Sequence, residues 1–183
     1  NAEATVPKRI LPLSRVYTLL EPGPVVLLTT TGARGPNVMP MSWHMMVDFE
    51  PPLVACIVSD RNFSFRALRK HRECVLNIPT AKLARQLVAC GNVSGRDVDK
   101  FAAFGLTPVR ASRVKAPLIR ECFANLECRV VDTRFVPKYC LFILEVVRAW
   151  RDPAVARPQT LHHRGYGKFM VAGREITLPS RMA

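Results

Sequence analysis

The hydrophobic positions of this chain fall into short runs separated by turn residues, which is the pattern of strands. Residues 24–30, "PVVLLTT", carry the β-branched side chains that predict a first strand. The turn "GARGPN" follows, and residues 38–47 predict a strand that returns beside the first. The segment "FEPP" breaks the chain there, and residues 53–59, "LVACIVS", predict a third strand.

The middle of the chain changes from strand spacing to helical spacing. Three short helices are predicted, because residues that favour helix ends flank each of them: residues 63–71, 81–91 and 97–105. Either Asn62 or Ser64 can cap the first helix. The segment "CVLNI", residues 74–78, predicts a strand between the first helix and the second.

The second half of the chain returns to strands. Residues 123–133 and 139–150 predict two strands that "RFVPK" can join as a hairpin. The second is almost continuously apolar, so we expect burial on both faces. The tail, residues 161–178, predicts a last hairpin that turns at Gly173. Many strands with few helices favour an antiparallel barrel with helices at its rim, because a doubly wound sheet needs regular strand–helix alternation.

Composition places these elements in a single globular domain, residues 1–183. With 49% hydrophobic and 22% charged residues the chain can bury a core, and no apolar run reaches the ~18 residues of a membrane helix. The formal net charge of +13 attracts anions. These charges are spread along the chain, without the clustered basic face and interleaved aromatic residues that favour nucleic-acid binding. Phosphorylated small molecules are the expected anions.

The six cysteines indicate a reducing compartment. They lie in or beside apolar stretches such as "LVACIVS" and "ECVLNIP", as buried thiols do, and no CxxC pair is present. Neither the cysteines nor the four histidines have metal-ligand spacing, so we expect no metal. The first residues, "NAEATVPKRILPLS", lack both a signal-peptide pattern and an initiating Met. We therefore expect a cytoplasmic protein with a trimmed chain, and whether residues are missing before it is open.

Common catalytic and nucleotide-binding motifs are missing from the sequence. It has no Walker loop and no GxGxxG, GxSxG or HExxH pattern. An enzyme with this sequence would therefore place its chemistry on a bound cofactor. His44 and His163 are the two catalytic candidates, although each can equally be a core or surface residue.

Three segments are candidate parts of one cofactor site, and the first is "NVMPMSW". A strand that passes a proline cannot complete its hydrogen-bond ladder, so its free backbone groups can face a planar heterocycle while Met and Trp pack against it. Alternatively, these side chains simply fill the core. The candidates in this segment are Asn37, Val38, Met39, Pro40, Met41, Ser42 and Trp43.

The second segment, "SDRNFSF" at residues 59–65, lies where a strand ends and a helix begins. Hydroxyl and amide side chains, a nearby arginine and the N–H groups of the first helical turn would form a phosphate pocket. An ordinary helix N-cap is the alternative interpretation. The candidates here are Ser59, Arg61, Asn62, Phe63 and Ser64.

The third segment combines "NIP" with "GNVSGRDVDKF". Asn77 ends a strand, where its amide could recognise a ring edge, and Ser94 with Lys100 could complete the phosphate pocket. The alternative is a polar loop with a surface lysine.

Taken in order, these segments resemble the flavin reductase-like family with the FMN-binding split-barrel fold, in its flavoredoxin group. The most specific likeness is "PNVMPMSWHMMVDFEPPLVACIVSDRNFSF", followed in the family's order by "ECVLNIP" and "CGNVSGRDVDKFAAFGLT". The resemblance implies a mainly β fold, a six-stranded antiparallel Greek-key split barrel with short flanking helices that forms a homodimer. It implies that 37–43 lies along the flavin, that 59–64 holds the phosphate, and that Asn77, Ser94 and Lys100 line the site. Met41 departs from the pattern, because many relatives have Thr there.

The same resemblance implies the leading hypothesis for function. It implies an FMN-binding oxidoreductase that takes hydride from NADH or NADPH onto bound flavin and passes electrons to free flavin or to a partner protein such as an oxygenase. The alternative is a flavoredoxin-like electron carrier that binds FMN but is reduced by another protein. The sequence does not distinguish NADH from NADPH, because it carries no Rossmann-type motif.

Overall fold

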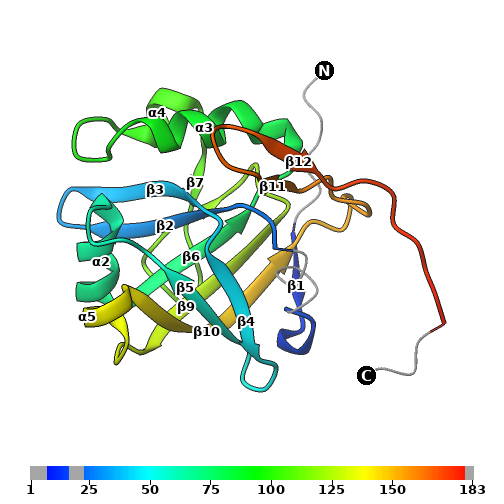
Figure 1. Ribbon diagram of the computed structural model, residues 1–183, viewed down its shortest axis with the longest axis horizontal. Helices are drawn as coiled ribbons and strands as arrows, with labels where there is room; N and C mark the ends of the chain where they lie inside the picture. Colours follow the sequence, from blue (N-terminus) through cyan, green and yellow to red (C-terminus); the bar gives the residue numbers. More distant parts are fainter. Residues whose placement is uncertain (1–7, 17–22, 180–183) are drawn as a thin grey trace.

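The computed structural model describes residues 8–16 and 23–179, and its main feature is one antiparallel sheet (Figure 1). Its strands are β1 (Arg9–Leu11), β2 (Val26–Gly32), β3 (Gly35–Met41), β4 (His44–Asp48), β5 (Leu53–Ile57), β6 (Glu73–Ile78), β9 (Ala124–Asp132) and β10 (Leu141–Arg151). They follow the order β3-β2-β6-β9-β10-β5-β4, and β1 pairs with the end of β10.

Ser42 and Trp43 join the two ends of this sheet. β3 and β4 lie at opposite ends of the strand order, yet only these two residues separate them in the chain. β3 pairs with β2, whereas β4 pairs with β5, and the carbonyl of Trp43 accepts a hydrogen bond from Ile57 N (3.0 Å). The prediction of one return strand over 38–47 is therefore wrong, because the segment bends into two strands with different partners. With β3 and β4 counted as one bent strand, the predicted six-stranded barrel is confirmed, and β1 is an addition to it.

Short helices flank the barrel. They are α2 (Phe63–His71), α3 (Ala84–Asn92), α4 (Lys100–Phe104) and α5 (Val136–Tyr139), with 3₁₀ turns η1 (Leu13–Arg15) and η2 (Ala81–Leu83). α2 is amphipathic: Phe65 and Leu68 enter the core while Arg66 is exposed. α3 and α4 lie together over β3, as Figure 1 shows.

The predicted helices differ from the observed ones mainly at their starts. α2 has the predicted bounds, whereas the second helix begins with a 3₁₀ turn before α3. The third helix, α4, begins only at Lys100, because the Asp99 carboxylate accepts hydrogen bonds from the N–H groups of Phe101 (3.0 Å) and Ala102 (3.3 Å) and so caps it. Gly105, at φ 65°, ends α4 as predicted.

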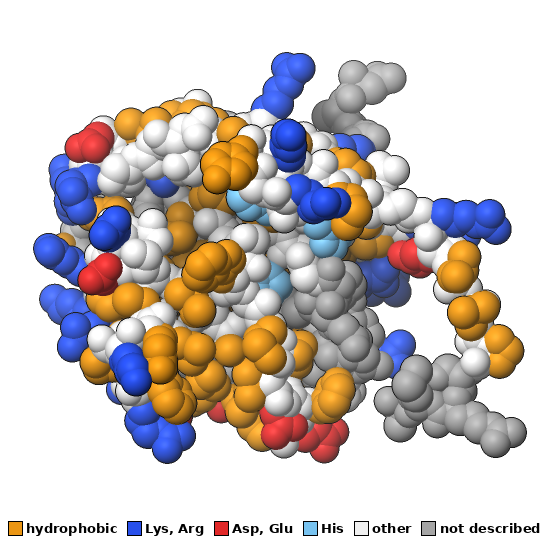
Figure 2. All heavy atoms as spheres, viewed as in Figure 1, with side chains coloured by type: hydrophobic (Ala, Val, Ile, Leu, Met, Phe, Trp, Pro, Cys, Tyr) orange, Lys and Arg blue, Asp and Glu red, His pale blue; other side chains and the backbone are white. Residues whose placement is uncertain are grey.

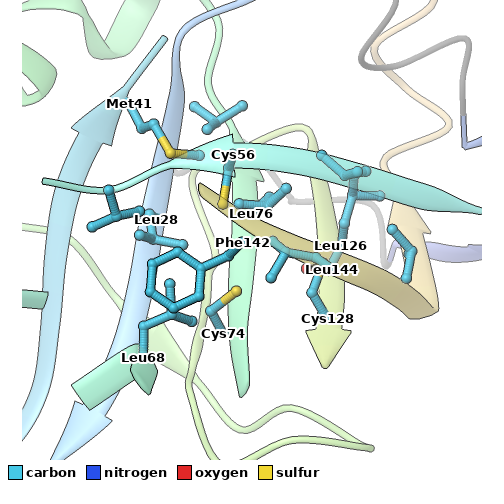
Figure 3. Packing of buried hydrophobic residues seen from close by; sticks show 14 of the residues in the cluster. Leu28, Met41, Cys56, Leu68, Cys74, Leu76, Leu126, Cys128, Phe142 and Leu144 are labelled. Atoms are coloured by element: carbon cyan, nitrogen blue, oxygen red, sulfur yellow. Dashed lines mark hydrogen bonds between the residues drawn. The ribbon is translucent and has the colours of Figure 1, made fainter. Parts of the chain in front are cut away.

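Two apolar clusters hold the barrel and its helical cover. Leu28, Leu76, Leu126 and Phe142 meet inside the barrel (Figure 3), where the ring of Phe65 lies edge-on to that of Phe142 at 5.6 Å. The second cluster packs α3 and α4 onto the other face of β2 and β3; it contains Leu27, Val38, Leu83, Leu87 and Phe101. The helices are thus fixed against β3, which places the α3–α4 connection at the rim of the barrel.

Burial along β10 corrects one expectation. Phe142, Leu144 and Val146 point into the barrel core, whereas the residues between them are only half-buried. The prediction of burial on both faces is therefore wrong, because the outer face of β10 is only partly covered. No helix in residues 8–16 and 23–179 is long and apolar enough to cross a membrane.

Two short hairpins complete the described chain. β7 (Pro108–Val109) pairs with β8 (Leu118–Ile119), and β11 (Leu161–His163) pairs with β12 (Phe169–Val171). The last hairpin turns through Gly165 and Gly167, which have φ of 88° and 72°, so the predicted turn at Gly173 is wrong. Val25 N donates to the carbonyl of Leu161 (2.7 Å), which anchors this hairpin beside β2.

Candidate functional site

The three predicted segments meet in a pocket of about 390 Å³ between β3, the start of α2 and the connection from α3 to α4. From the first segment come Asn37, Met39 and Pro40, and from the second come Arg61, Asn62, Phe63 and Ser64. Ser94 and Lys100 represent the third segment. We call this hollow the phosphate pocket, because the hydrogen-bond donors described below suit an anion.

A buried contact between all three segments forms the floor of this pocket. Asn37 Nδ2 donates to Ser64 Oγ at 2.9 Å, and both side chains are buried. Gly95 approaches the same amide so closely that a Cβ there would lie 1.9 Å from Asn37 Oδ1 and 3.1 Å from Phe63 Cδ1. A side chain at this position would displace Asn37, so Gly95 allows the three segments to touch.

The start of α2 offers hydrogen-bond donors to the pocket. Asn62 is the N-cap residue, yet its side chain makes no capping bond to the first turn. Because Ser64 Oγ accepts from Asn37, its own hydroxyl proton remains available to donate. An anion in the pocket would therefore meet uncapped N–H groups, a hydroxyl and the positive end of a helix dipole.

Lys100 adds a buried positive charge. Its side chain is 5% exposed, and Nζ donates to the carbonyl of Cys90 at 2.7 Å. In the part of the chain that the structure describes, no carboxylate lies within ion-pair distance of it. Burial lowers the pKa of Lys100, whereas burial raises the pKa of Cys90 to about 11, so the thiol is neutral at pH 7 and does not balance the ammonium.

A buried ammonium without a counter-charge is costly, and an anionic ligand removes that cost. The donors around it form hydrogen bonds of the kind that phosphate oxygens accept. The residues present therefore fit the phosphate end of a cofactor such as FMN.

A second hollow of about 290 Å³ adjoins the first and shares Pro40, Gly91 and Asn92 with it. Its remaining lining is mostly apolar and comes from β3, α3 and the last hairpin: Val25, Met41, Ser42, Leu87, Val88, His163, Gly167 and Phe169. The ring of His163 lies 5.2 Å from that of Phe169, so it is held at the wall of this hollow. Together the two hollows form a groove with a polar end and an apolar end, and we call the second the apolar pocket.

Several predicted residues do not line either pocket. Val38 is buried under α3, on the opposite face of β3 from Asn37, because side chains alternate along a strand. Trp43 is 69% exposed. Ser59 shapes the turn before α2, since its hydroxyl accepts from Arg61 N at 3.3 Å.

Asn77 has a structural role instead of the predicted place at a ring edge. Its Nδ2 donates to the carbonyl of Leu27 (2.8 Å), and its Oδ1 accepts from Ile119 N (2.9 Å) and Asn125 Nδ2 (2.7 Å). Asn125 lies directly opposite on the neighbouring strand β9. All of these bonds are buried, so this amide stabilises the sheet and is not available to a ligand.

The two catalytic candidates have different surroundings. His44 Nε2 lies 2.6 Å from the carbonyl of Pro24, and His44 lines neither pocket. Burial lowers its pKa, so the imidazole is neutral at pH 7 and donates this bond from Nε2. His163 is the candidate that the structure brings to the groove. Among the described residues, no three His, Cys, Asp or Glu side chains gather as a metal site.

Sequence reasoning missed the end of α3. Gly91 and Asn92 line both pockets, and a Cβ on Gly91 would lie 3.1 Å from Pro40 Cγ, so this glycine lets α3 approach β3. The pair "GN" opens the third predicted segment, but neither residue was chosen as a candidate there, because Gly91 was interpreted as the end of the helix. Phe169 was also missed, because its position depends on how the last hairpin folds back.

Comparison with known proteins agrees with this geometry. The family model for the flavin reductase like domain matches residues 19–170. The uncharacterized protein YddH of Escherichia coli is 34% identical over 179 residues, which cover 90% of this chain and 95% of that protein. The structure superposes on an FMN-binding domain of a flavin reductases-like enzyme from Shewanella baltica OS155 with a TM-score of 0.91, at 24% identity, over 97% of this chain and 100% of the other.

A further solved structure, flavoredoxin of Desulfovibrio vulgaris (Miyazaki F), gives a TM-score of 0.78 at 23% identity and covers 85% of this chain and 90% of the other. At these identities the two structures show the fold. The family match spans most of the chain, and the E. coli relative extends it to nearly the whole length. This chain belongs to the flavin reductase-like family.

Proposed function

We propose that the protein is an FMN-dependent oxidoreductase that takes hydride from NADH or NADPH onto bound flavin and passes electrons to free flavin or a partner protein. The observation that carries this proposal is Lys100, a buried ammonium that lines a pocket of phosphate-type donors and has no carboxylate partner in the described chain. The likeness to the FMN-binding domain from Shewanella baltica supports the choice of FMN.

The groove suggests how the cofactor lies. Its phosphate would sit against Ser64, Asn62 and Lys100, and its ring would extend past Pro40 toward the apolar pocket. When bound, FMN supplies the two-electron chemistry that the side chains of this groove do not offer. The chain binds and orients it, and the apolar walls from Met41, Leu87 and Phe169 exclude water from the ring.

The apolar pocket is the proposed place for the nicotinamide or for an electron acceptor. His163 lies at its wall, where an imidazole can donate a hydrogen bond to a polar edge of a bound ring. The net charge of +13 favours the approach of FMN and of a dinucleotide phosphate from solution.

The second candidate function is a flavoredoxin-like electron carrier that binds FMN but receives its electrons from another protein. The observation that favours it is the structural likeness to flavoredoxin of Desulfovibrio vulgaris. Both functions place FMN in the same groove, so only the source of electrons separates them.

Absorption spectra recorded without oxygen test both functions. We expect the purified protein to take up FMN and its yellow colour to bleach when NADH or NADPH is added. A flavin that binds but stays oxidised with both nucleotides would favour the carrier instead. A protein that takes up no FMN would contradict both.

We further propose a homodimer in a reducing cytoplasm. Exposed apolar side chains follow β4 and the residues on either side of it, and we call them the β4 stripe: Trp43, Met45, Val47 and Phe49. Figure 2 shows hydrophobic side chains gathered over this part of the surface. An exposed apolar stripe of this length marks a contact surface, and a second copy of the chain would cover it. The six cysteines are free thiols, which supports a reducing compartment.

A further inference from the structure

A third hollow, of about 280 Å³, shares Gly95 with the phosphate pocket. Its size is near the ~300 Å³ at which small-molecule sites begin. The turn between β2 and β3 contributes Arg34, the start of β3 contributes Pro36, and the segment before α4 contributes Arg96 and Val98. Because Gly95 lines both hollows, the two are neighbours.

Two arginines line the third hollow. Arg34 Nη1 donates to the carbonyl of Arg96 at 3.0 Å, which ties the β2–β3 turn to the α3–α4 connection. The guanidinium of Arg96 lies 5.9 Å from the ring centroid of Phe63, and Phe63 lines the phosphate pocket. The Arg96 guanidinium therefore lies against a residue of the phosphate pocket wall, and Arg34 is tied to Arg96 on the side of the third hollow.

Both guanidinium groups have N–H donors available to a ligand. Within residues 8–16 and 23–179, neither Arg34 nor Arg96 forms an ion pair with a carboxylate. Two carboxylates line the same hollow, but Asp99 is bound to the N–H groups that begin α4, and Asp97 is exposed to solvent. A phosphate is the ligand that matches guanidinium donors in this fork geometry.

We propose that this hollow is a second phosphate subsite, in which Arg34 and Arg96 take a phosphate of an adenine dinucleotide next to the flavin phosphate. Pro36, Val98 and Pro108 give it an apolar wall for the attached adenosine. The phosphate has two possible sources, the adenylate end of FAD or a pyridine dinucleotide bound beside FMN. The inference rests on the proposed function, because it takes the flavin phosphate in the first pocket as its neighbour.

Equilibrium titrations test this subsite. Dissociation constants for FMN and FAD would be measured by flavin fluorescence, and those for NADP⁺ and NAD⁺ on the FMN-loaded protein by calorimetry. The variant is the double substitution Arg34→Ala and Arg96→Ala. Arg85→Ala is the charge control, because Arg85 is exposed on α3 and lines none of the three hollows.

We expect the double variant to bind FMN within about threefold of the unmodified protein, which also reports that it folds. Either its FAD-to-FMN affinity ratio or its affinity for NADP⁺ should fall roughly tenfold or more, and which one falls identifies the source of the phosphate. Arg85→Ala should change neither.

The subsite is rejected if all affinities of the double variant stay unchanged, or if those for FMN, FAD and NADP⁺ fall by one common factor. In that case the proposed function stands, since FMN still binds the unmodified protein. If the unmodified protein binds neither flavin, the proposed function fails and the subsite fails with it.

Discussion

At the scale of single residues, Lys100 is the side chain whose buried charge most needs an anionic ligand. Its ammonium is buried against the carbonyl of Cys90 and has no carboxylate partner in the described chain. Burying such a charge costs free energy, and proteins tolerate that cost mainly at functional sites. We therefore propose that the cofactor phosphate neutralises the charge of Lys100.

Because the pKa of Lys100 is lowered, the stability of the ligand-free protein and its affinity for FMN should change with pH in opposite directions. A lysine with a lower pKa in the folded than in the unfolded state binds fewer protons when folded. The stability of the ligand-free protein should therefore rise between that lowered pKa and the ordinary value of 10.5. The FMN phosphate favours the ammonium, so FMN affinity should fall as the pH rises through the lowered pKa.

Flavin fluorescence titrations from about pH 7 to about pH 10 measure this effect. In Lys100→Met, FMN affinity at neutral pH should be roughly tenfold lower, and it should vary little over the same interval. An equally steep pH dependence in the variant would show that another group is responsible.

The start of α2 gives a second prediction at this scale. Combining Asn62→Ala with Ser64→Ala should weaken FMN binding by about 1–3 kcal/mol for each charge-assisted bond lost. Ser59→Ala is the matched control, because Ser59 lies in the same segment but outside the pocket. Calorimetric titration would measure the FMN affinity of the unmodified protein, the double variant and the control. An unchanged affinity in the double variant would rule out this phosphate position.

At the scale of elements, the site exists because α3 and α4 are held against β3. The close contacts of Gly91 with Pro40 and of Gly95 with Asn37 help to set this distance: a Cβ on Gly91 would lie tightly against Pro40, and one on Gly95 would displace Asn37. Leu87 and Phe101 pack the two helices onto the barrel. The groove is therefore a product of helix packing and not of any single loop.

Replacing Gly95 by alanine tests this packing. Its Cβ would lie 1.9 Å from Asn37 Oδ1, so the α3–α4 connection must move and the Asn37–Ser64 bond is strained. We expect the free energy of unfolding to fall by about 1–3 kcal/mol and FMN binding to weaken. Gly173→Ala is the control, because nothing lies within 4 Å of its Cβ position. Urea unfolding measures the stability of both variants, and equal stabilities would contradict the close contact.

Local sequence signals predicted where helices and strands lie better than which strands pair with each other. Turn and cap residues correctly marked α2 and the end of α4 at Gly105. The division between β3 and β4 was missed, because it follows from barrel closure between distant strands. The role of Asn77 was missed for the same reason: only the register of β6 with β9 reveals Asn125 opposite it.

At the scale of the whole molecule, charge and apolar surface occupy different places. Lys and Arg side chains gather along the edge of the molecule that carries α2, at the left of Figure 2, whereas hydrophobic side chains gather over β4. The basic edge lies beside the phosphate pocket, and the apolar face is the proposed contact with a second copy.

The dimer is tested by Met45→Glu, which places a charge in the middle of the β4 stripe, where Met45 is 63% exposed. We expect the unmodified protein to be a dimer by light scattering and this variant to be a monomer, because an uncompensated carboxylate would be buried at the contact. Val131→Glu alters an exposed apolar residue on β9 and should remain dimeric. A monomeric unmodified protein would contradict the contact.

The central claim is that this groove grips FMN by its phosphate, and parallel titration of the protein with FMN and riboflavin tests it most directly. The two ligands share the ring and differ in the phosphate, so the ratio of their dissociation constants measures the contribution of Ser64, Lys100 and the start of α2. The account predicts that FMN binds at least about a hundredfold more tightly. Equal affinity for the two ligands, or no binding of FMN, would contradict it.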